Sequence, residues 1–328
     1  MNFYLIGIDY KNVSLELREK ILKKRKIIQE FWDKYPSQQA AILSTCNRFE
    51  IYCLGRNNLD ARLHILLFKS YFSGLFNNAY VKFGRENVFY HLIRLASGLE
   101  SQLQGEAQIV EQLESWLSHN SISFSLRNLW KKALIFAIEI RLKAGLSQIE
   151  NNIATIVYRD LLKKKSGSHQ LKVIVVGTGK IAQLLADYCP QNIRLYFVSH
   201  KHHFQAVKLA QKSKGEVLSF KELGDFIPDI DALISATSSP HLILNREIFL
   251  KIKRAQPLYL YDLALPRDID PEVGNIKDIV LKNLDSLAVY FTAHNANLKQ
   301  KIGLVEYLIS EALDKEREES HEEIFSGR

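Results

Sequence analysis

One cysteine in this sequence stands where a reactive thiol would be expected. Cys46 lies in the polar segment STCNR (residues 44–48), between two short apolar runs at 40–43 and 50–54 that predict strands. A thiol has an ordinary pKa of about 8.5, and a neighbouring guanidinium favours the thiolate, so we expect Arg48 to lower the pKa of Cys46. A thiolate held beside an ester carbonyl provides a covalent acyl-enzyme route. The pattern therefore predicts a nucleophilic cysteine.

The other two cysteines have no comparable setting. Cys53 lies in the apolar run EIYCL, and Cys189 precedes Pro190 at the end of an expected helix, so both are interpreted as packing residues. The three cysteines form no CxxC pair, and the ten histidines lack zinc-like spacing. We therefore expect neither a disulfide framework nor a structural metal.

A second polar constellation is the segment SGLESQLQGEAQIVEQ, residues 97–112. Gln108 and Gln112 are four residues apart and share one helix face, while Ser101 and Glu106 lie in the loop that leads into that helix. Polar groups converging there would suit the ammonium and carboxylate of an amino acid. The same pattern also fits a helix cap followed by solvated glutamines, and both interpretations stay open.

The clearest local motif is a glycine loop. GTGKIA follows the β-branched run 171–176 and begins a helix, which is the dinucleotide-binding arrangement with Ala182 in the third small position. Gly177 allows the tight turn, Gly179 allows the pyrophosphate to approach, and the phosphates lie at the helix amino terminus. A bare structural turn is the alternative, and the strand–turn–helix context favours a bound dinucleotide.

The end of the following strand bears on the choice of cofactor. An NAD site usually has an acidic residue there for the ribose 2′-hydroxyl. The sequence at this point is FVSHKH (residues 197–202), which contains no acid, whereas Ser199 and Lys201 are able to donate to a 2′-phosphate. The segment favours NADP.

Apolar periodicity outlines the elements that hold these groups. In the first part we expect a strand at 3–8, one helix at about 14–35 that ends at Pro36, and mostly helix from about 60 to 165. After the polar segment 163–169, continuous apolar strands alternate with helices, as in a parallel sheet that is covered on both faces. The expected strands are at 171–176, 195–198, 216–218, 232–235 and 258–261.

The C-terminal part shows an apolar stripe at helical spacing, which predicts one long helix. Its members are Leu284, Leu287, Phe291, Leu298, Ile302, Val305, Ile309 and Leu313. The fold class expected is multidomain α/β. It comprises an N-terminal α+β catalytic domain (1–150), a Rossmann-type NADP domain with a parallel sheet (151–283) and the C-terminal helix (284–328) with a shortened dimerisation region.

Composition limits the classes of protein to consider. The chain has 328 residues, of which 47% are hydrophobic and 24% charged, as in globular proteins. No apolar run is long enough for a membrane span, and the first residues lack the pattern of a secretory signal, so we expect a cytoplasmic protein. Residues 311–328 contain three basic and seven acidic side chains, a net charge of −4. Since the whole chain carries +8, residues 1–310 carry +12. A polyanionic partner fits that charge.

Taken together, the motifs identify a family. AILSTCNRFEIY, HLIRLASGLESQLQGEAQIVEQ, VIVVGTGKIA, ALISATSSP and YDLALPRDIDPEV occur in the order and at about the spacings seen in glutamyl-tRNA reductases, and the resemblance covers about residues 1 to 300. It implies an enzyme of tetrapyrrole biosynthesis that uses NADPH to reduce tRNA-bound glutamate to glutamate-1-semialdehyde. In that family a cysteine thioester precedes hydride transfer and releases the tRNA.

The resemblance also implies roles for individual residues. Cys46 matches the family's nucleophile, and His91 matches a histidine that is important for activity. The phosphate loop maps to Gly177, Thr178, Gly179, Lys180, Ile181 and Ala182. The positions that match the family's substrate contacts are Thr45, Asn47, Arg48, Ser101, Glu106, Ala107, Gln108 and Gln112.

Two departures are mild: the family usually has Pro at Ala107 and Asp at Glu100. Many members continue into a C-terminal dimerisation region, whereas this sequence ends at Arg328, so a homodimer is left open. The family also suggests transfer of the product to an aminomutase partner.

Two other functions were weighed. A thiol-dependent acyl or aldehyde dehydrogenase acting on a free small molecule explains Cys46 and the glycine loop, but not the basic charge or the paired motifs. A redox-sensing regulator would need a DNA-binding element, and the sequence shows no helix-turn-helix pattern.

Overall fold

A computed structural model describes residues 2–33, 40–55, 57–106, 108–119, 122–146, 152–164, 169–250, 252, 254, 256–293 and 296–326. The chain divides into two compact units. Unit 1 contains residues 1–151 and 292–328, and unit 2 contains residues 152–291. Each unit is described by itself.

Unit 1 is built on a four-stranded antiparallel sheet with strand order β2-β3-β1-β4. β3 lies between β2 and β1, and its Ile51 pairs with Ile42 of β2 and Ile6 of β1. The segment that contains Cys46 joins β2 to β3. β4 lies in the part that periodicity predicted to be helical, so that expectation was wrong for this short strand. The strands are β1 (Asn2–Asp9), β2 (Ala40–Ser44), β3 (Arg48–Gly55) and β4 (Tyr80–Phe83).

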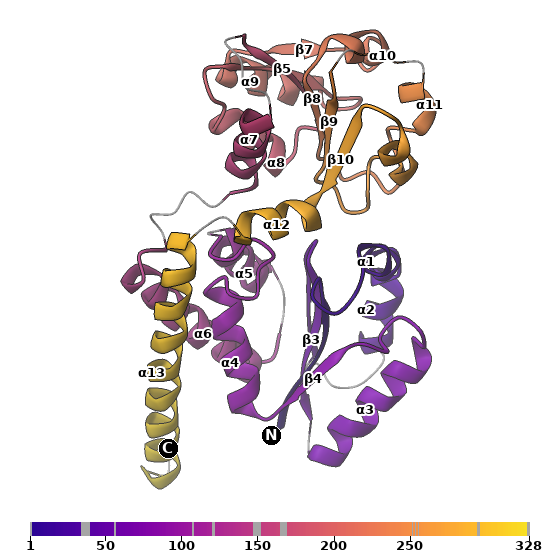
Figure 1. Ribbon diagram of the computed structural model, residues 1–328. Helices are drawn as coiled ribbons and strands as arrows, with labels where there is room; N and C mark the ends of the chain where they lie inside the picture. Colours follow the sequence, from indigo (N-terminus) through magenta and orange to yellow (C-terminus); the bar gives the residue numbers. More distant parts are fainter. Residues whose placement is uncertain are drawn as a thin grey trace. The chain divides into compact units, whose positions relative to one another are not determined.

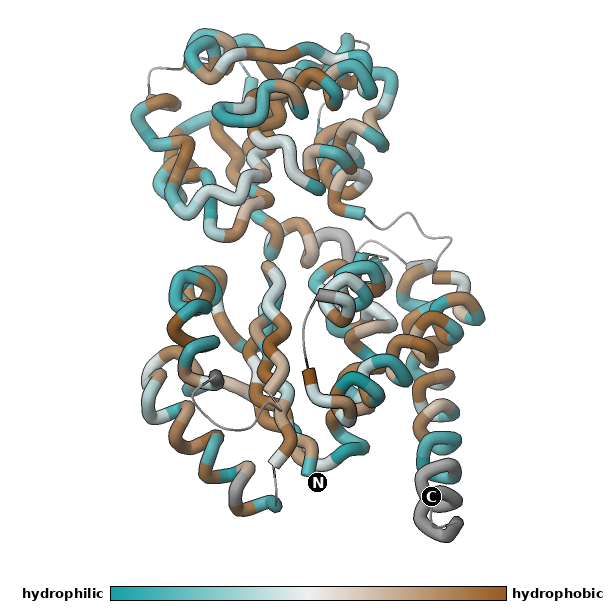
Figure 2. The backbone as a smooth tube through the Cα atoms, turned by 180° about the vertical axis from the view of Figure 1, so that it is seen from behind, coloured by the Kyte–Doolittle hydropathy of each residue, from teal (hydrophilic) through white to brown (hydrophobic). Residues whose placement is uncertain are grey.

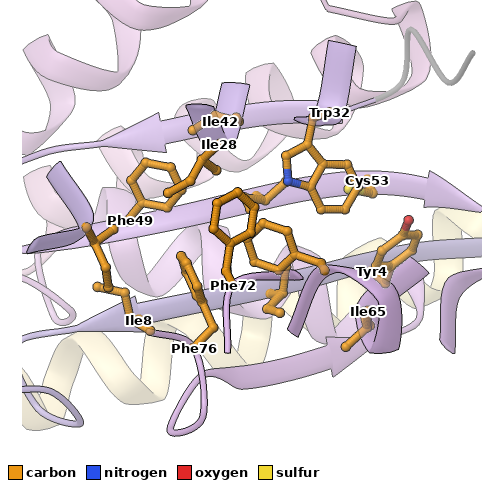
Figure 3. Packing of buried hydrophobic residues seen from close by; sticks show 14 of the residues in the cluster. Tyr4, Ile8, Ile28, Trp32, Ile42, Phe49, Cys53, Ile65, Phe72 and Phe76 are labelled. Carbon is orange, nitrogen blue, oxygen red and sulfur yellow. The ribbon is translucent and has the colours of Figure 1, made fainter. Parts of the chain in front are cut away.

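Helices cover both faces of this sheet, with α1, α2 and α3 on one side and α4, α5 and α6 on the other (Figure 1). One face of β3 packs into an aromatic core that includes Phe49, Cys53, Trp32 and Phe72 (Figure 3). The helices are α1 (Leu15–Lys23), α2 (Arg25–Asp33), α3 (Asn58–Tyr71), α4 (Arg85–Ala96), α5 (Gln108–His119) and α6 (Phe124–Lys143).

Alternation along β3 sorts its side chains by face, as the pleat of a strand requires. Phe49, Ile51 and Cys53 enter the aromatic core. The intervening positions carry polar groups towards α4 and α6, where the Tyr52 ring packs edge-on to Trp130. β3 thereby separates the aromatic core on one side of the sheet from the buried polar groups on the other.

The C-terminal helix α13 (Ala296–Ser326) also belongs to unit 1 and runs beside α4 and α6 (Figure 1). Its residues Leu298, Val305, Ile309 and Ala312 are buried. The long C-terminal helix expected from the sequence is present, and this part of its apolar stripe packs on the body of the chain.

Two helical segments differ from the single helices that were expected. The segment 14–33 is divided into α1 and α2 at Lys24, within four consecutive cations (23–26). Pro36, the expected end of that helix, lies outside the described residues. The stripe from Leu284 is described as two helices, α12 (Leu284–Ala293) and α13.

Unit 2 has a six-stranded parallel sheet with strand order β10-β9-β8-β5-β6-β7. The first strand, β5, lies in the middle of the sheet. β6 and β7 are added on one side of it and β8 to β10 on the other, which is the strand order of the doubly wound dinucleotide fold. The parallel sheet is therefore confirmed. The strands are β5 (Leu171–Val176), β6 (Ile193–Val198), β7 (Glu216–Leu218), β8 (Ala232–Ser235), β9 (Leu258–Asp262) and β10 (Ile279–Asn283), the last of which periodicity missed.

The buried strands of unit 2 are hydrophobic and its turns are mainly hydrophilic (Figure 2). A core of side chains on one face includes Ile174, Val176, Leu233, Leu260 and Phe249. The helices are α7 (Ile153–Lys164), α8 (Lys180–Asp187), α9 (His203–Ser213), α10 (Leu223–Phe226) and α11 (Arg246–Leu250), with two short 3-10 helices at Ile227–Asp229 and Pro271–Asn275.

Candidate active site

Cys46 lies in the tight turn that joins β2 to β3. The turn is closed by the Thr45 amide, which donates to the Arg48 carbonyl at 3.0 Å, and by the Asn47 amide, which donates to Thr45 Oγ1 at 3.2 Å. The Tyr10 amide donates to the Asn47 carbonyl at 3.0 Å and ties the turn to β1. The Cys46 side chain is exposed to solvent. A sharp polar turn thus presents the thiol at the end of a rigid hairpin.

The electrostatic surroundings of Cys46 differ from the expectation. Desolvation by nearby protein atoms, joined by the charge of Glu106, raises the pKa of the thiol to about 11. Arg18 and Arg48 act in the opposite direction, so the expected influence of Arg48 is present, but it is outweighed. The net direction is therefore a raised pKa, opposite to the lowered pKa that was expected.

A buried charge network lies directly behind this turn. Arg48 Nη1 donates to Glu50 Oε1 at 2.7 Å, and His91 Nε2 donates to the same oxygen at 2.9 Å. The hydroxyls of Tyr52 and Tyr80 also donate to Glu50, each at 2.5 Å. Burial alone would raise the pKa of Glu50, but His91, Arg48 and these hydrogen bonds outweigh it and hold the pKa well below its usual range. Glu50 is an ionised, fully bonded carboxylate inside the protein.

The network leads to the loop at 97–106, which follows α4. Arg48 Nη2 donates to the Glu100 carbonyl, and the Tyr10 hydroxyl donates to the Ser101 carbonyl at 3.2 Å. At the base of the loop, Arg141 donates to the Ser97 and Gly105 carbonyls at 2.9 and 3.1 Å. Side chains from distant parts of unit 1 therefore hold the backbone of this loop next to the Cys46 turn.

Several side chains around this loop and turn carry a buried polar atom without a hydrogen-bond partner in the described part of the chain. These atoms are Ser44 Oγ, Asn47 Oδ1, Ser97 Oγ, Ser101 Oγ and Gln108 Nε2. Leaving a buried polar atom unpaired costs about 1–3 kcal/mol, and native proteins avoid it. A concentration of such atoms in two adjoining segments is what a binding site for a polar ligand requires.

The structure brings most of the expected substrate residues to one place. Thr45, Asn47 and Arg48 flank Cys46, and hydrogen bonds or charge interactions connect Ser101 and Glu106 to the same group. The other three expected residues lie at or before the start of α5. Gln108 and Gln112 share a face of that helix, whereas Ala107 lies outside the described residues.

Two expected residues are placed deeper than the sequence suggested. His91 is buried in α4 and bonds to Glu50. The Arg48 guanidinium is also buried, and two of its nitrogens already donate within the protein. The Arg48 side chain is 1% exposed, so in this structure its guanidinium serves Glu50 and the Glu100 carbonyl and offers no surface to a substrate carboxylate.

Sequence reasoning missed Glu50 and Arg18. Glu50 had a visible signal, because it is the one acid in the apolar run RFEIYCLG of β3. Arg18 is buried in α1, and its Nη1 donates to the Cys46 carbonyl at 3.3 Å. Nothing in its local sequence distinguishes it from the other arginines and lysines of the chain.

The second candidate site is the glycine loop of unit 2. Gly177 has φ +114°, and a Cβ atom there would lie 2.5 Å from the Ala236 carbonyl oxygen, so only glycine fits. At Gly179 an added Cβ would meet open space. Gly179 is also the N-cap of α8 and provides no side-chain cap, so the first amides of the helix face outward for an anion. Ala182 is fully buried, as close packing of helix on strand requires.

The residues expected near a 2′-phosphate lie directly after β6. Ser199 Oγ accepts from the His202 amide at 3.1 Å and shapes the turn into α9. Lys201 is exposed. Thr178, Lys180 and Ile181 occupy the loop and the first turn of α8 as expected from the motif.

A buried acid pair supports the adjoining strand ends of β8 and β9. Asp268 accepts from Ser235 Oγ at 2.8 Å and from Thr237 Oγ1 at 2.6 Å. Asp262 accepts from the amides of Asp268 and Ile269 at 3.1 and 2.9 Å. Burial, which the amide hydrogen bonds oppose, raises the pKa of Asp262 to about 6. The pair joins two loops at the carboxyl end of the sheet, where ligands of this fold bind.

Comparison with known proteins relates these sites to a family. Residues 6–143 match the family model described as glutamyl-tRNA(Glu) reductase, N-terminal domain. The glutamyl-tRNA reductase of Pelotomaculum thermopropionicum is 30% identical over 333 residues, which cover 96% of this chain and 74% of that protein. The chain belongs to the glutamyl-tRNA reductase family. The reductase of Aquifex aeolicus is 29% identical and matches 91% of this chain and 76% of its own length.

The solved structures agree with this assignment. The glutamyl-tRNA reductase from Methanopyrus kandleri matches 98% of this chain and 80% of its own, with a TM-score of 0.51 and 26% identity. Residues 160–289 also match the family model described as shikimate / quinate 5-dehydrogenase, which agrees with a nucleotide-binding domain of the NAD(P) type in unit 2. As a member of the glutamyl-tRNA reductase family, the chain is an oxidoreductase of tetrapyrrole biosynthesis.

Two features are absent from the described part of the chain. No described helix is long and apolar enough to span a membrane. Among the described residues there is also no cluster of three or more His, Cys, Asp or Glu arranged to hold a metal ion.

Proposed function

We propose that this chain reduces the glutamyl ester of glutamyl-tRNA to glutamate-1-semialdehyde through a thioester on Cys46, with NADPH as the reductant. The observation that carries the proposal is the exposed Cys46 beside unpaired buried polar atoms of Asn47 and Ser101. An aminoacyl group offers the donors and acceptors that these atoms lack.

In the first step, the sulfur of Cys46 attacks the ester carbonyl carbon. A C–S bond forms, the C–O bond to the tRNA breaks, and the proton of the thiol ends on the ribose hydroxyl of the released tRNA. The loop Gly177–Ala182 would hold NADPH, with Ser199 and Lys201 as donors to its 2′-phosphate, and the bound cofactor would supply the hydride. Hydride addition to the thioester carbonyl then breaks the C–S bond, and Cys46 regains a proton as the aldehyde leaves.

Substrate binding would itself activate the thiol. Glu106 is one cause of the raised pKa of Cys46. When the ammonium of the glutamyl group pairs with Glu106, that negative charge is neutralised and the pKa of Cys46 falls. Arg48 would position the loop at 97–106 through the Glu100 carbonyl. Thr45, Asn47, Ser101, Gln108 and Gln112 would contact the glutamyl group, and His91 would act through Glu50.

The test is single-turnover oxidation of NADPH, followed at 340 nm, with glutamyl-tRNA or with uncharged tRNA plus free glutamate. Oxidation is expected only with the charged tRNA, and it should be abolished in Cys46→Ser. Cys189→Ser is the control, because that half-buried thiol lies in unit 2. Oxidation by Cys46→Ser at more than a trace of the wild-type rate, or turnover with free glutamate, would refute the proposal.

The family resemblance also suggests an aminomutase that takes up the semialdehyde, and a homodimer. Both remain predictions. Sedimentation of the purified chain, alone and with the aminomutase, measures them directly, and a single species with the mass of one chain in both runs would contradict them.

A further inference from the structure

Arg94 connects three parts of unit 1. It lies on α4, and its Nε donates to Glu100 Oε1 in the substrate loop at 2.6 Å. Its Nη1 donates to both carboxylate oxygens of Glu306 on α13, at 2.6 and 2.5 Å. One planar guanidinium thus bridges the C-terminal helix and the loop that precedes Ser101, as the fork geometry of arginine allows.

Glu100 is held at both of its ends. Its carbonyl accepts from Arg48, while its carboxylate accepts from Lys11 Nζ at 2.6 Å as well as from Arg94. Burial opposes ionisation, but the bonds from Lys11 and Arg94 lower the pKa of Glu100 to about 2. The carboxylate is therefore charged at any physiological pH, and the backbone that leads to Ser101 is fixed from two sides.

The attachment of α13 does not depend on Glu306. Leu298, Val305 and Ile309 are buried on unit 1 and supply an apolar contact of their own. A second ion-pair cluster, in which Arg85 and Lys132 bond to Glu316, anchors α13 to α4 and α6 without touching the loop. The carboxylate of Glu306 is thus not needed to hold the helix in place.

The pair of Arg94 with Glu100 is better shielded than an ordinary surface ion pair, whereas the Glu306 side chain on the other side of Arg94 is 41% exposed. The side chains of Arg94 and Glu100 are 20% and 12% exposed, compared with 54% for each partner of the Arg317–Glu86 pair. Exposed pairs contribute little because solvent and salt screen them. The network that reaches the loop is the one in which a lost charge has a measurable effect.

We propose that Glu306 is a positioning residue for the substrate loop: by fixing Arg94, it holds Glu100, and with it Ser101, where the glutamyl group binds. This rests on the proposed function. Without Glu306 the guanidinium of Arg94 keeps Tyr90, whose hydroxyl accepts at 3.2 Å, but loses its bond to α13. Its hold on Glu100 is then weaker, the carboxylate depends more on Lys11, and the loop gains freedom. Binding of the aminoacyl group then has to restrict that freedom, which weakens affinity while leaving the chemistry at Cys46 unchanged.

The test compares Glu306→Gln with Glu316→Gln in steady-state reduction of glutamyl-tRNA. Glu306→Gln is expected to raise the KM for glutamyl-tRNA about threefold, the effect of losing one partly exposed ion pair, with kcat near the wild-type value. Glu316→Gln removes a carboxylate from the same helix and should leave both parameters near wild type. Equal KM changes in the two variants would overturn the proposal, because they would show a general effect of loosening α13.

A double-mutant cycle tests whether Glu306 acts through Arg94 and Glu100. Because one network carries both effects, Glu306→Gln combined with Glu100→Gln should raise KM little more than the larger single change. If the KM of the double variant instead rises by the product of the two single factors, the two residues act independently, which would contradict the inference. If the wild-type chain does not oxidise NADPH with glutamyl-tRNA, the proposed function fails. If it does so and Glu306→Gln has normal KM, only the inference fails.

Discussion

The two candidate sites of this chain are built in opposite ways. In unit 1 the site consists of side chains, and the charges that surround Cys46 come from α1, β3 and the loop at 97–106. In unit 2 the site consists mainly of backbone, because one tight turn at Gly177 and the uncapped start of α8 form the phosphate loop within a few residues. The site around Cys46 therefore depends on contacts between distant segments, whereas the phosphate loop of unit 2 is formed by one short segment.

This difference indicates where each site is vulnerable. A site of buried charges fails when one partner is removed, because the remaining charge has neither water nor a counter-ion. A backbone site fails when an added atom occupies the space of the ligand or of the neighbouring chain. Substitutions that keep the size of a side chain but remove its charge should therefore damage unit 1. Substitutions that leave the charge unchanged but add atoms should damage unit 2.

The largest effect is expected for Glu50→Gln. This isosteric change leaves Arg48 buried without its carboxylate, which should reduce the stability of unit 1 by about 3–5 kcal/mol. Urea unfolding followed by tryptophan fluorescence measures it, since all three tryptophans lie in unit 1. In the control Glu139→Gln, whose partner Lys143 is exposed, the loss should stay below about 1 kcal/mol. Similar losses in both variants would remove the distinction between buried and surface charge.

The glycine loop offers a matched pair of substitutions for unit 2. Gly177→Ala adds a Cβ 2.5 Å from the Ala236 oxygen at φ +114°, so it should destabilise the unit by at least about 1–3 kcal/mol and abolish NADPH binding. Gly179→Ala adds its Cβ to open space, so the fold should be retained while NADPH affinity falls. Thermal unfolding and fluorescence titration with NADPH separate the two. Normal NADPH affinity in Gly179→Ala would mean that the pyrophosphate binds elsewhere.

The acid pair of unit 2 predicts a pH effect on stability. The pKa of Asp262 is raised to about 6, so the folded state binds more protons than the unfolded state between about pH 4 and pH 6. Its contribution to stability is therefore present at low pH and is lost as the pH rises through about 6, by at most about 3 kcal/mol. Asp262→Asn should flatten this part of the stability profile, as measured by thermal unfolding across the range, while Asp225→Asn on the surface should not. An unchanged slope in Asp262→Asn would contradict the assignment.

The smallest expected effect concerns the thiol itself. The rate of alkylation of Cys46 by iodoacetamide should rise with pH up to about 11, following the thiolate fraction. Glu106→Gln removes a charge that raises this pKa, so alkylation at pH 8 should accelerate, by less than about tenfold. Subtraction of the rate for Cys46→Ser corrects for the other two cysteines. A slower rate in Glu106→Gln would show that this carboxylate does not act on the thiol as proposed.

Local patterns in the sequence predicted much of this molecule. The strands at 171–176, 216–218 and 232–235 were expected at the observed bounds, because continuous apolar runs between turns are local signals. β4 and β10 were missed, since their side chains are only partly buried and show no clear alternation. The grouping of Ser101 and Glu106 with the Cys46 turn was expected from family motifs rather than from spacing.

The sequence by itself determined the individual strands of the parallel sheet, the glycine loop and the polar turn that presents Cys46, because each depends on neighbours within a few residues. Only the tertiary structure decided the electrostatics. It raised the pKa of Cys46 where its nearest arginine predicted the reverse, and it revealed Glu50 and Arg18 as buried partners. It also joined Glu306 to Glu100 through Arg94, across a separation of 212 residues between Arg94 and Glu306. The physical reason is that desolvation and charge pairing depend on which distant segments fold against a group, and no local pattern records that.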